Sequence, residues 1–223
     1  MPKRIWLIAA AAVLGLGGGF FLRAAAAQHG FSARALVGRI IDVALPHHAA
    51  LVMLGDSLTA FADWNVLLPS FDVANRGIPG DKTDGVLKRI NSINGMHPRC
   101  VAVMLGVNDL RAGRSVQQIS ENYKTIIDSL RASGATVIVE STLATSRSFA
   151  QFNTSVIDLN HSLDEMCRQA GRCLYLDLNS TLAPQGILDD TTDGLHIGPN
   201  SYRLWANTLT PLLNANCRTR LSQ

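Results

Sequence analysis

The chain lacks low-complexity tracts and internal repeats, and most of it lacks an excess of charge of either sign. It has 20 Lys and Arg against 17 Asp and Glu, and three of the basic residues, Lys3, Arg4 and Arg23, lie in the first 27 residues, where there is no acid. The rest of the chain therefore has 17 basic and 17 acidic residues and no net charge. Because nucleic-acid binding relies on an excess of positive charge, this balance argues against a nucleic-acid partner.

Cysteines are also few, and none of them has the C-x-x-C spacing of a zinc site. The four are Cys100, Cys167, Cys173 and Cys217, and we expect no metal. An even number of cysteines permits two disulfides if the chain is exported. Four free thiols are the alternative.

The N-terminal segment has the layout of an export signal. A basic start at Lys3 and Arg4 precedes an uncharged apolar run over 5–22, and the alanines after Arg23 offer A-x-A cleavage sites. The run is also close to the length that spans a bilayer, and residues 5–22 would then associate with a membrane. We interpret 1–27 as an export signal or an N-terminal membrane anchor, which predicts a periplasmic or extracellular protein. A buried N-terminal helix is the remaining alternative.

From residue 49 to 217, apolar runs rich in β-branched residues alternate with stretches of helical periodicity. Residues 28–48 precede this region as an expected lead-in helix, and 218–223 follow it as a short tail. The alternation predicts an α/β domain in which a parallel five-stranded sheet lies between two layers of helices. Right-handed crossovers leave few topologies, and among them we predict the doubly wound strand order 2-1-3-4-5. The runs that predict the strands are 50–55, 71–75, 100–105, 135–140 and 173–178.

The four cysteines lie at the ends of expected helices and strands, and these positions predict how they pair. Cys167 ends a helix and Cys173 opens the fifth strand, with Gly171 in the turn between them. Cys100 opens the third strand, and Cys217 ends the last helix. Because that helix must run antiparallel to the strands, it finishes at the edge of the sheet where Cys100 lies. We therefore predict the disulfides Cys167–Cys173 and Cys100–Cys217.

Residues suited to chemistry follow the strands at the points where each strand ends. Asp56 and Ser57 follow the first strand, and Gly77 follows the second. Residues 106–109 follow the third strand, and 193–196 end the loop after the fifth. The carboxyl ends of parallel strands share one edge of the sheet, where such sheets bind ligands. We therefore expect these residues to lie close together.

Together these residues suit acyl transfer through a serine. A serine hydroxyl needs a base, and histidine, with an ordinary pKa near 6.5, is suited to that role. His196 can be the base, and Asp193, three residues earlier, can hold its tautomer. The backbone N–H groups of Ser57 and Gly77 and the amide of Asn108 can bind the oxyanion of the transition state. The sequence thus predicts Ser57, Asp193 and His196 as catalytic residues and Ser57, Gly77 and Asn108 as the oxyanion hole.

Taken in order, four segments resemble the four blocks of the SGNH hydrolases, also called GDSL esterases/lipases. The resemblance implies a flavodoxin-like three-layer α/β/α fold, ester hydrolysis without a metal or cofactor, and the same catalytic and oxyanion residues. The run VANRGIPGDKTDGVLKRI looks most like the acetylhydrolase-like branch. The four blocks are GDSL at 55–58, NRGIPG around Gly77, GVND around Asn108 and DGLH at 193–196.

Some residues near these blocks have more than one interpretation. Trp64, one or two turns after Ser57, either lines the substrate pocket or packs in the core. Asp56 and Asp109 lie in the blocks, but we expect them to bond loop backbone. Residues 158–161, DLNH, repeat the D-x-x-H spacing, but they lie in a stretch of helical periodicity, which predicts an exposed pair on a helix.

The predicted function is that of an exported serine esterase acting on short acyl groups, acetyl above all, through an acyl-serine intermediate. The chain has little spare length for a lid over a long acyl tail. The expected substrate is a small-molecule or carbohydrate ester. An acyltransferase for a cell-envelope polysaccharide and a non-catalytic carbohydrate-binding protein are the alternatives, and the sequence leaves the oligomeric state open.

Overall fold

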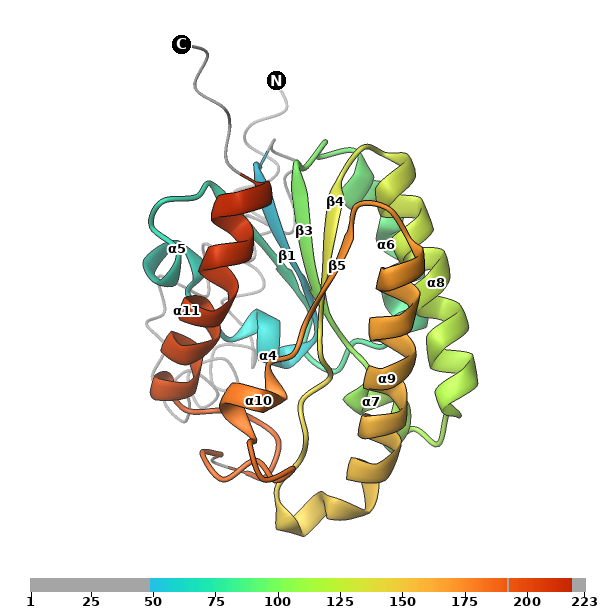
Figure 1. The fold of residues 1–223 in the computed structure, drawn as a ribbon, viewed down its shortest axis with the longest axis vertical. Coiled ribbons are helices and arrows are strands. Elements are labelled where there is room, and N and C mark those ends of the chain that lie inside the picture. The colour runs from blue at the N-terminus through green and yellow to red at the C-terminus, as the bar shows by residue number, and fades with distance from the viewer. Residues whose placement is uncertain (1–48, 192, 218–223) are drawn as a thin grey trace, which may run out of the picture. The chain divides into compact units, whose positions relative to one another are not determined.

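The computed structural model describes residues 49–191 and 193–217, which form five parallel strands between two layers of helices (Figure 1). The predicted export segment 1–27, lead-in helix 28–48 and tail 218–223 lie outside the described residues. The strand order β2-β1-β3-β4-β5 confirms the predicted topology. The strands are β1 Leu51–Gly55, β2 Val73–Gly77, β3 Cys100–Met104, β4 Thr136–Glu140 and β5 Cys173–Leu176.

Strand β2 lies two residues later than the predicted run 71–75. The parallel register pairs Leu51 with Val73 and Gly55 with Gly77, so that β1 and β2 end at the same level. A shift by an even number of residues leaves every side chain on its expected face of the sheet. It does, however, make Gly77 the last residue of the strand instead of the first residue of the loop.

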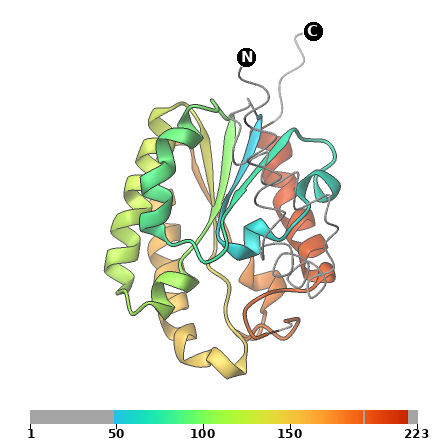
Figure 2. The same ribbon diagram turned by 180° about the vertical axis from the view of Figure 1, so that it is seen from behind.

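Helices cover both faces of the sheet (Figure 1). On one face lie α6 Thr83–Asn94, α8 Val116–Ala132 and α9 Asn153–Gln169, and on the other lie α5 Trp64–Leu67 and α11 Pro199–Asn216. Within the described part of the chain, no helix is long and apolar enough to cross a membrane. The short elements toward the carboxyl ends of the strands are α4 Ser57–Ala60, α7 Val107–Arg111, η1 Arg147–Phe152 and α10 Asn179–Leu182 (Figures 1 and 2).

The sheet is buried on both sides, which explains why its strands appear in the sequence as continuous apolar runs. Successive side chains of a strand point to opposite faces. Val52 and Leu54 of β1 belong to the core beneath α6, α8 and α9, whereas Leu51 and Met53 belong to the core beneath α11. All four are fully buried, and burial of one such side chain stabilises the fold by about 1.5–3 kcal/mol.

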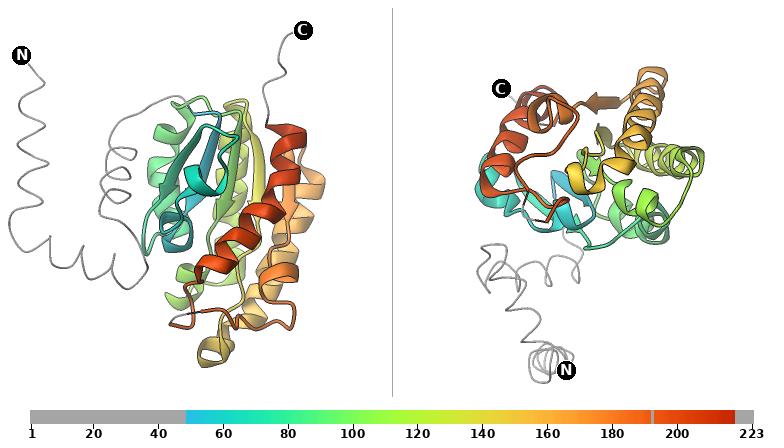
Figure 3. Two further views of the ribbon diagram at one scale, coloured as in Figure 1. Left: turned by 90° about the vertical axis from the view of Figure 1, so that its left-hand side faces the viewer. Right: turned by 90° about the horizontal axis from the view of Figure 1, so that it is seen from below.

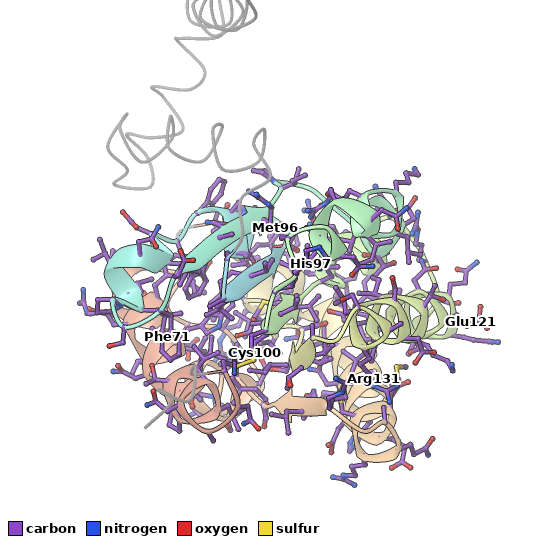
Figure 4. All side chains as sticks on the ribbon, turned by 90° about the horizontal axis from the view of Figure 1, so that it is seen from above. Phe71, Met96, His97, Cys100, Glu121 and Arg131 are labelled. Atoms are coloured by element: carbon purple, nitrogen blue, oxygen red, sulfur yellow. A yellow bond between two sulfur atoms is a disulfide. The ribbon has the colours of Figure 1, made fainter. Side chains whose placement is uncertain are left out.

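Both predicted disulfides are present, so the alternative of four free thiols is wrong. The Cα atoms are 5.7 Å apart in Cys100–Cys217 and 4.8 Å apart in Cys167–Cys173, both within reach of a bridge. The first joins the start of β3 to the residue after α11, and Cys100 is visible from above in Figure 4. Because it links residues 117 positions apart, loop entropy predicts a stabilisation of roughly 4–5 kcal/mol.

The carboxyl group of Glu140, at the end of β4, is buried beneath α11. Glu140 is fully buried, and its Oε1 accepts a hydrogen bond of 2.6 Å from Trp205 Nε1. Its Oε2 has no hydrogen-bond partner among the described residues. Burial raises the pKa of Glu140 from 4.5 to about 8, although the bond from Trp205 opposes this shift. The folded protein therefore holds a proton on Glu140 at neutral pH.

The Glu140→Gln variant is expected to be more stable than the parent protein at neutral pH. Between pH 4.5 and 8 the unfolded chain releases the Glu140 proton and the folded protein keeps it, so the parent's free energy of unfolding falls as the pH rises. The variant has no group that titrates at this position. Its free energy of unfolding, relative to that of the parent, should therefore rise by about 3 kcal/mol from pH 4.5 to 7. Urea unfolding at both pH values measures the difference.

Glu121→Gln is the matched control, because Glu121 lies on the exposed side of α8, at the margin of the molecule in Figure 4. It removes the same charge without changing the core. A stability advantage of Glu140→Gln that did not change with pH, or that Glu121→Gln shared, would contradict the assignment of a buried proton to Glu140.

Candidate active site

The predicted site residues lie at the carboxyl end of the sheet. α4 begins two residues after β1, and α7 begins three residues after β3. Both short helices lie at the lower end of the sheet in Figure 2, and this end faces the viewer on the right of Figure 3. The loop over 193–196 comes to the same end, because His196 bonds Ser57, 139 residues earlier in the chain.

Ser57 is the first residue of α4, and Asp56 is the N-cap of that helix. The side chain of Asp56 accepts a hydrogen bond of 3.0 Å from Leu58 N–H, which holds the turn between strand and helix. Such an N-cap leaves the first N–H of the helix without an intrahelical acceptor. The Ser57 N–H accordingly makes no hydrogen bond to the described residues and remains available beside the Ser57 hydroxyl.

A chain of hydrogen bonds joins Ser57, His196 and Asp193. Ser57 Oγ lies 2.8 Å from His196 Nε2, and His196 Nδ1 lies 2.6 Å from Asp193 Oδ2. The other oxygen of Asp193 accepts from the backbone N–H of Leu195 at 3.0 Å and of His196 at 2.8 Å. The imidazole is thus held at both ring nitrogens, and its Nε2 points at the serine hydroxyl.

Asp193 is ionised at every pH at which the protein would be assayed. Partial desolvation alone would raise its pKa, but hydrogen bonds from the backbone and imidazole of His196 and from Leu195 N–H outweigh it and lower the pKa to about 2. A permanent carboxylate beside Nδ1 favours the tautomer with its proton there and leaves Nε2 free to accept one.

The structure departs from the sequence expectation at Gly77. Its N–H donates to the side-chain oxygen of Asn75 at 3.0 Å, and Gly77 does not line the cavity beside Ser57. A Cβ at Gly77 would lie 2.3 Å from the backbone nitrogen of Ala60, so this glycine allows α4 to pack against β2. Register explains the difference, because Gly77 is the last residue of β2 and not part of the loop.

Gly80, and not Gly77, lies beside Ser57 where the sequence analysis expected a backbone N–H donor. It lines the cavity beside Ser57, and its N–H makes no hydrogen bond to the described residues. Its φ of +76° is in the left-handed region, which glycine adopts without steric cost. The signal for it was present in the sequence as the second glycine of NRGIPG.

Asn108 lies in the first turn of α7 and lines the same cavity. Its Nδ2 donates to Asp56 Oδ2 and to the backbone oxygen of Asp81, both at 3.1 Å. Asp81 in turn accepts a hydrogen bond of 2.9 Å from the guanidinium of Arg89. These contacts connect the loop that carries Gly80 to Asn108 and to the turn that carries Ser57.

Asp56 and Asp109 bond backbone and neighbouring side chains, as the sequence analysis expected. Burial raises the pKa of Asp56 to about 7, the bond from Leu58 N–H opposes this shift, and the charges of Asp81 and Asp109 add to it. Asp109 is fully buried and accepts from the backbone N–H and hydroxyl of Thr83. Burial is likewise the largest cause that raises the pKa of Asp109.

A cavity of about 200 Å³ lies beside the serine hydroxyl. Most of its lining is apolar, and the polar exceptions are few. The lining residues are Ser57, Leu58, Phe61, Pro79, Gly80, Val107, Asn108, Arg111, Leu195 and His196.

Two residues with alternative interpretations lie away from this cavity. Trp64 is only 1 % exposed and packs edge-on against Trp205, with its Nε1 bonded to the Thr59 carbonyl. The structure therefore places Trp64 in the core instead of the substrate pocket. His161 lies on α9 and lines a separate cavity of about 280 Å³ with Asp164 and Tyr175.

No group of three His, Cys, Asp or Glu side chains in residues 49–191 and 193–217 could hold a metal ion. What the site offers instead is a hydroxyl, a base and unbonded N–H groups. The hydroxyl can attack a carbonyl, the imidazole can take its proton, and the N–H groups can bind the resulting oxyanion. This is the arrangement that acyl transfer from an ester needs.

The fold is similar to those of several solved esterases. A lipase/acylhydrolase from Enterococcus faecalis shares 23 % identity at a TM-score of 0.65, over 77 % of this chain and 98 % of that one. A carbohydrate esterase family 3 protein from Talaromyces cellulolyticus shares 20 % identity at a TM-score of 0.63, over 74 % of this chain and 96 % of that one. An acetyl-xylooligosaccharide esterase mutant from Geobacillus shares 12 % identity at a TM-score of 0.61, over 80 % of this chain and 100 % of that one.

At these identities the structural likeness shows the fold alone. Among curated protein sequences, none matches the chain. The sequence itself carries the family assignment, because residues 53–204, more than half of the chain, match the GDSL-like lipase/acylhydrolase family. The chain belongs to this family and is an ester hydrolase of the SGNH/GDSL type.

Proposed function

We propose that the protein hydrolyses short-chain carboxylic esters, acetyl esters above all, through an acyl intermediate on Ser57. The observation that carries the proposal is the hydrogen-bonded chain from Asp193 through His196 to Ser57, with a small apolar cavity beside the hydroxyl. Export through residues 1–27, to the periplasm or the cell exterior, is part of the proposal. Two disulfides are consistent with it, because disulfides persist in oxidising compartments.

In the first half of the reaction, Ser57 Oγ attacks the ester carbonyl and His196 Nε2 takes the hydroxyl proton. The backbone N–H groups of Ser57 and Gly80 stabilise the oxyanion. The Nδ2 group of Asn108 joins them by giving up one of its two 3.1 Å hydrogen bonds and donating to the oxyanion instead. Asp193 stabilises the imidazolium. The tetrahedral intermediate collapses as His196 returns the proton to the leaving alcohol.

In the second half of the reaction, water takes the place of the alcohol. His196 removes a proton from the water, which attacks the acyl-Ser57 carbonyl. The same N–H groups bind the second oxyanion, and collapse releases the acid as Ser57 recovers its proton. No step requires a cofactor, because the proton always moves between Ser57 or a substrate oxygen and one imidazole nitrogen.

The size of the cavity supports an acetyl preference, since about 200 Å³ leaves little room for a long acyl chain. A carbohydrate ester is the substrate class that we favour. Two of the similar solved structures are a carbohydrate esterase and an acetyl-xylooligosaccharide esterase, and both share this fold.

A panel of 4-nitrophenyl esters, from acetate to palmitate, together with acetylated xylo-oligosaccharides, tests the proposal. The purified full chain should show its highest kcat/KM on acetyl esters. A preference for palmitate would contradict the acyl assignment. Acetylated acceptor formed faster than free acetate, detected by mass spectrometry with added sugar, would indicate an acyltransferase, and carbohydrate binding without turnover would indicate a binding protein.

Asn108→Ala is expected to lower kcat by about 10²–10³-fold and to change KM little, because the amide is proposed to bind an oxyanion that forms only in the transition state. Steady-state kinetics on 4-nitrophenyl acetate measures both constants. Asn65→Ala, which removes an exposed amide from α5, is the control and should leave both unchanged. A change confined to KM would instead make Asn108 a ground-state binding residue.

A further inference from the structure

The cavity beside Ser57 has one permanently charged side chain in its lining, that of Arg111. The other lining residues are apolar or uncharged apart from the proposed base, His196, and none of them is an Asp or Glu. Ester cleavage by the proposed mechanism uses Ser57, His196 and Asp193 and gives Arg111 no part in proton transfer. Arg111 is exposed to solvent, so its charge is accessible to a molecule bound in the cavity.

Arg111 has no counter-ion within residues 49–191 and 193–217. No carboxylate of these residues forms an ion pair with it. Arg114, three residues later, differs in this respect, because it pairs with Asp84 at 2.9 Å and with Asp109 at 3.1 Å. The positive charge of Arg111 is thus left for a group that comes from outside the fold.

Arg111 is also held in position relative to the catalytic residues. Its guanidinium carbon lies 5.8 Å from the centre of the Phe149 ring, within the range of a cation–π contact. The Phe149 ring packs in turn on Gly194, where a Cβ would lie 2.8 Å from it, and Gly194 stands between Asp193 and His196. Phe149 therefore connects the guanidinium to the loop that carries the base.

The position of Arg111 on α7 places it on the same side of the helix as Asn108. It follows Asn108 by three residues, so the two share one face of the helix with Cβ atoms about 5–6 Å apart. A group attached to a carbonyl bound beside Asn108 would thus be within reach of the Arg111 side chain, which lines the same cavity. If the acyl group is acetyl, it has no room for a charge, and a group at Arg111 must belong to the alcohol part of the ester.

We infer that Arg111 binds an anionic group, a carboxylate or a phosphate, in the alcohol part of the substrate. This inference rests on the proposed function and names its substrate class. A guanidinium presents paired N–H donors that match the oxygens of either anion. The protein is then selective for acidic esters, such as acetylated molecules that carry an acid group near the acetyl.

Three matched acetates test the inference: phenyl acetate, 4-acetoxybenzoate and 4-acetoxyphenyl phosphate. The Arg111→Met variant keeps the length of the side chain and removes its charge. Its loss of kcat/KM on at least one anionic ester should exceed its loss on phenyl acetate by about 10- to 100-fold, the range expected for a hydrogen bond to a charged group. The anionic ester with the larger loss identifies carboxylate or phosphate as the preferred group.

Two further variants control the kinetic test. Arg111→Lys keeps the charge and should recover part of the selectivity. Arg147→Met removes an exposed arginine of η1 that does not line the cavity, and it should leave the rates on all three esters unchanged. Equal losses on the three esters for Arg111→Met, or the same selectivity loss in Arg147→Met, would overturn the inference.

Binding to inactive protein separates this inference from the proposed function. Calorimetry should show that Ser57→Ala binds 4-acetoxybenzoate or 4-acetoxyphenyl phosphate at least tenfold more tightly than Ser57→Ala/Arg111→Met does. Equal dissociation constants would overturn the Arg111 assignment even if phenyl acetate is hydrolysed. Binding that depends on Arg111 in a protein that hydrolyses none of the esters would support the anion site and overturn the esterase proposal.

Discussion

Ser57→Ala is expected to lower kcat on 4-nitrophenyl acetate by about 10⁴–10⁶-fold. Without Oγ there is no nucleophile within reach of the carbonyl. His196, which lies 2.8 Å from Oγ in the parent, then has no hydroxyl proton to accept. The oxyanion donors remain, so a residual acceleration over water is part of the expected result.

Two measurements make this expectation specific. Circular dichroism and the urea midpoint should match the parent protein, because α4 keeps its N-cap Asp56 and the variant loses only a partly exposed oxygen. Ser70→Ala, at an exposed position outside the cavity, should retain full activity. A folded Ser57→Ala protein with most of its activity would remove Ser57 as nucleophile. Labelling of the parent, but not of this variant, by a fluorophosphonate gives the same answer without turnover.

His196→Ala is expected to lower kcat by a similar factor, about 10⁵–10⁶-fold, because nucleophile and base act as one unit. His161→Ala is the matched control. Both histidines follow an aspartate by three residues, but the His196 ring bonds Ser57 and Asp193, whereas His161 lines a different cavity from α9. His161→Ala should therefore keep the parent's rate. Loss of activity in His161→Ala alone would show that the proposed site is not the catalytic one.

The role of His196 as the base also predicts how the reaction rate depends on pH. A protonated imidazole cannot accept a proton, so kcat/KM should fall toward acidic pH with a single limb. Asp193 does not add a limb, because its pKa of about 2 keeps it ionised throughout the range of the assay. Asp193→Asn should lower kcat by about 10⁴-fold, since the wrong tautomer of His196 is then favoured.

Asp56 is the other group that titrates near neutral pH beside the site, with a pKa of about 7. The Asp56→Asn variant separates its contribution from that of the base. We expect the acidic limb of kcat/KM to persist in this variant, measured from pH 4 to 9. A limb that vanished in Asp56→Asn would assign it to the hydrogen bond between Asp56 and Asn108 instead of the imidazole.

The sequence by itself determined the number, order and direction of the strands. β-branched runs and helical stretches are local patterns, set by which neighbours are apolar. Right-handed crossovers leave few topologies for five such strands, and the doubly wound order is one of them. It also determined which residues follow the strands. Because parallel strands end at one edge, the predictions for Ser57, Asn108 and His196 needed no distances. The cysteine pairs followed from the same reasoning, since helix and strand ends meet at defined edges.

Only the tertiary structure decided between residues that look equivalent along the chain. Gly77 and Gly80 both belong to NRGIPG, but the pairing of Gly55 with Gly77 places the first in the sheet and leaves the second on the cavity. Trp64 fits a pocket or a core equally well by sequence, and its contact with Trp205, far along the chain, buries it. Such choices depend on register and on contacts between distant segments, which no local pattern of residues encodes.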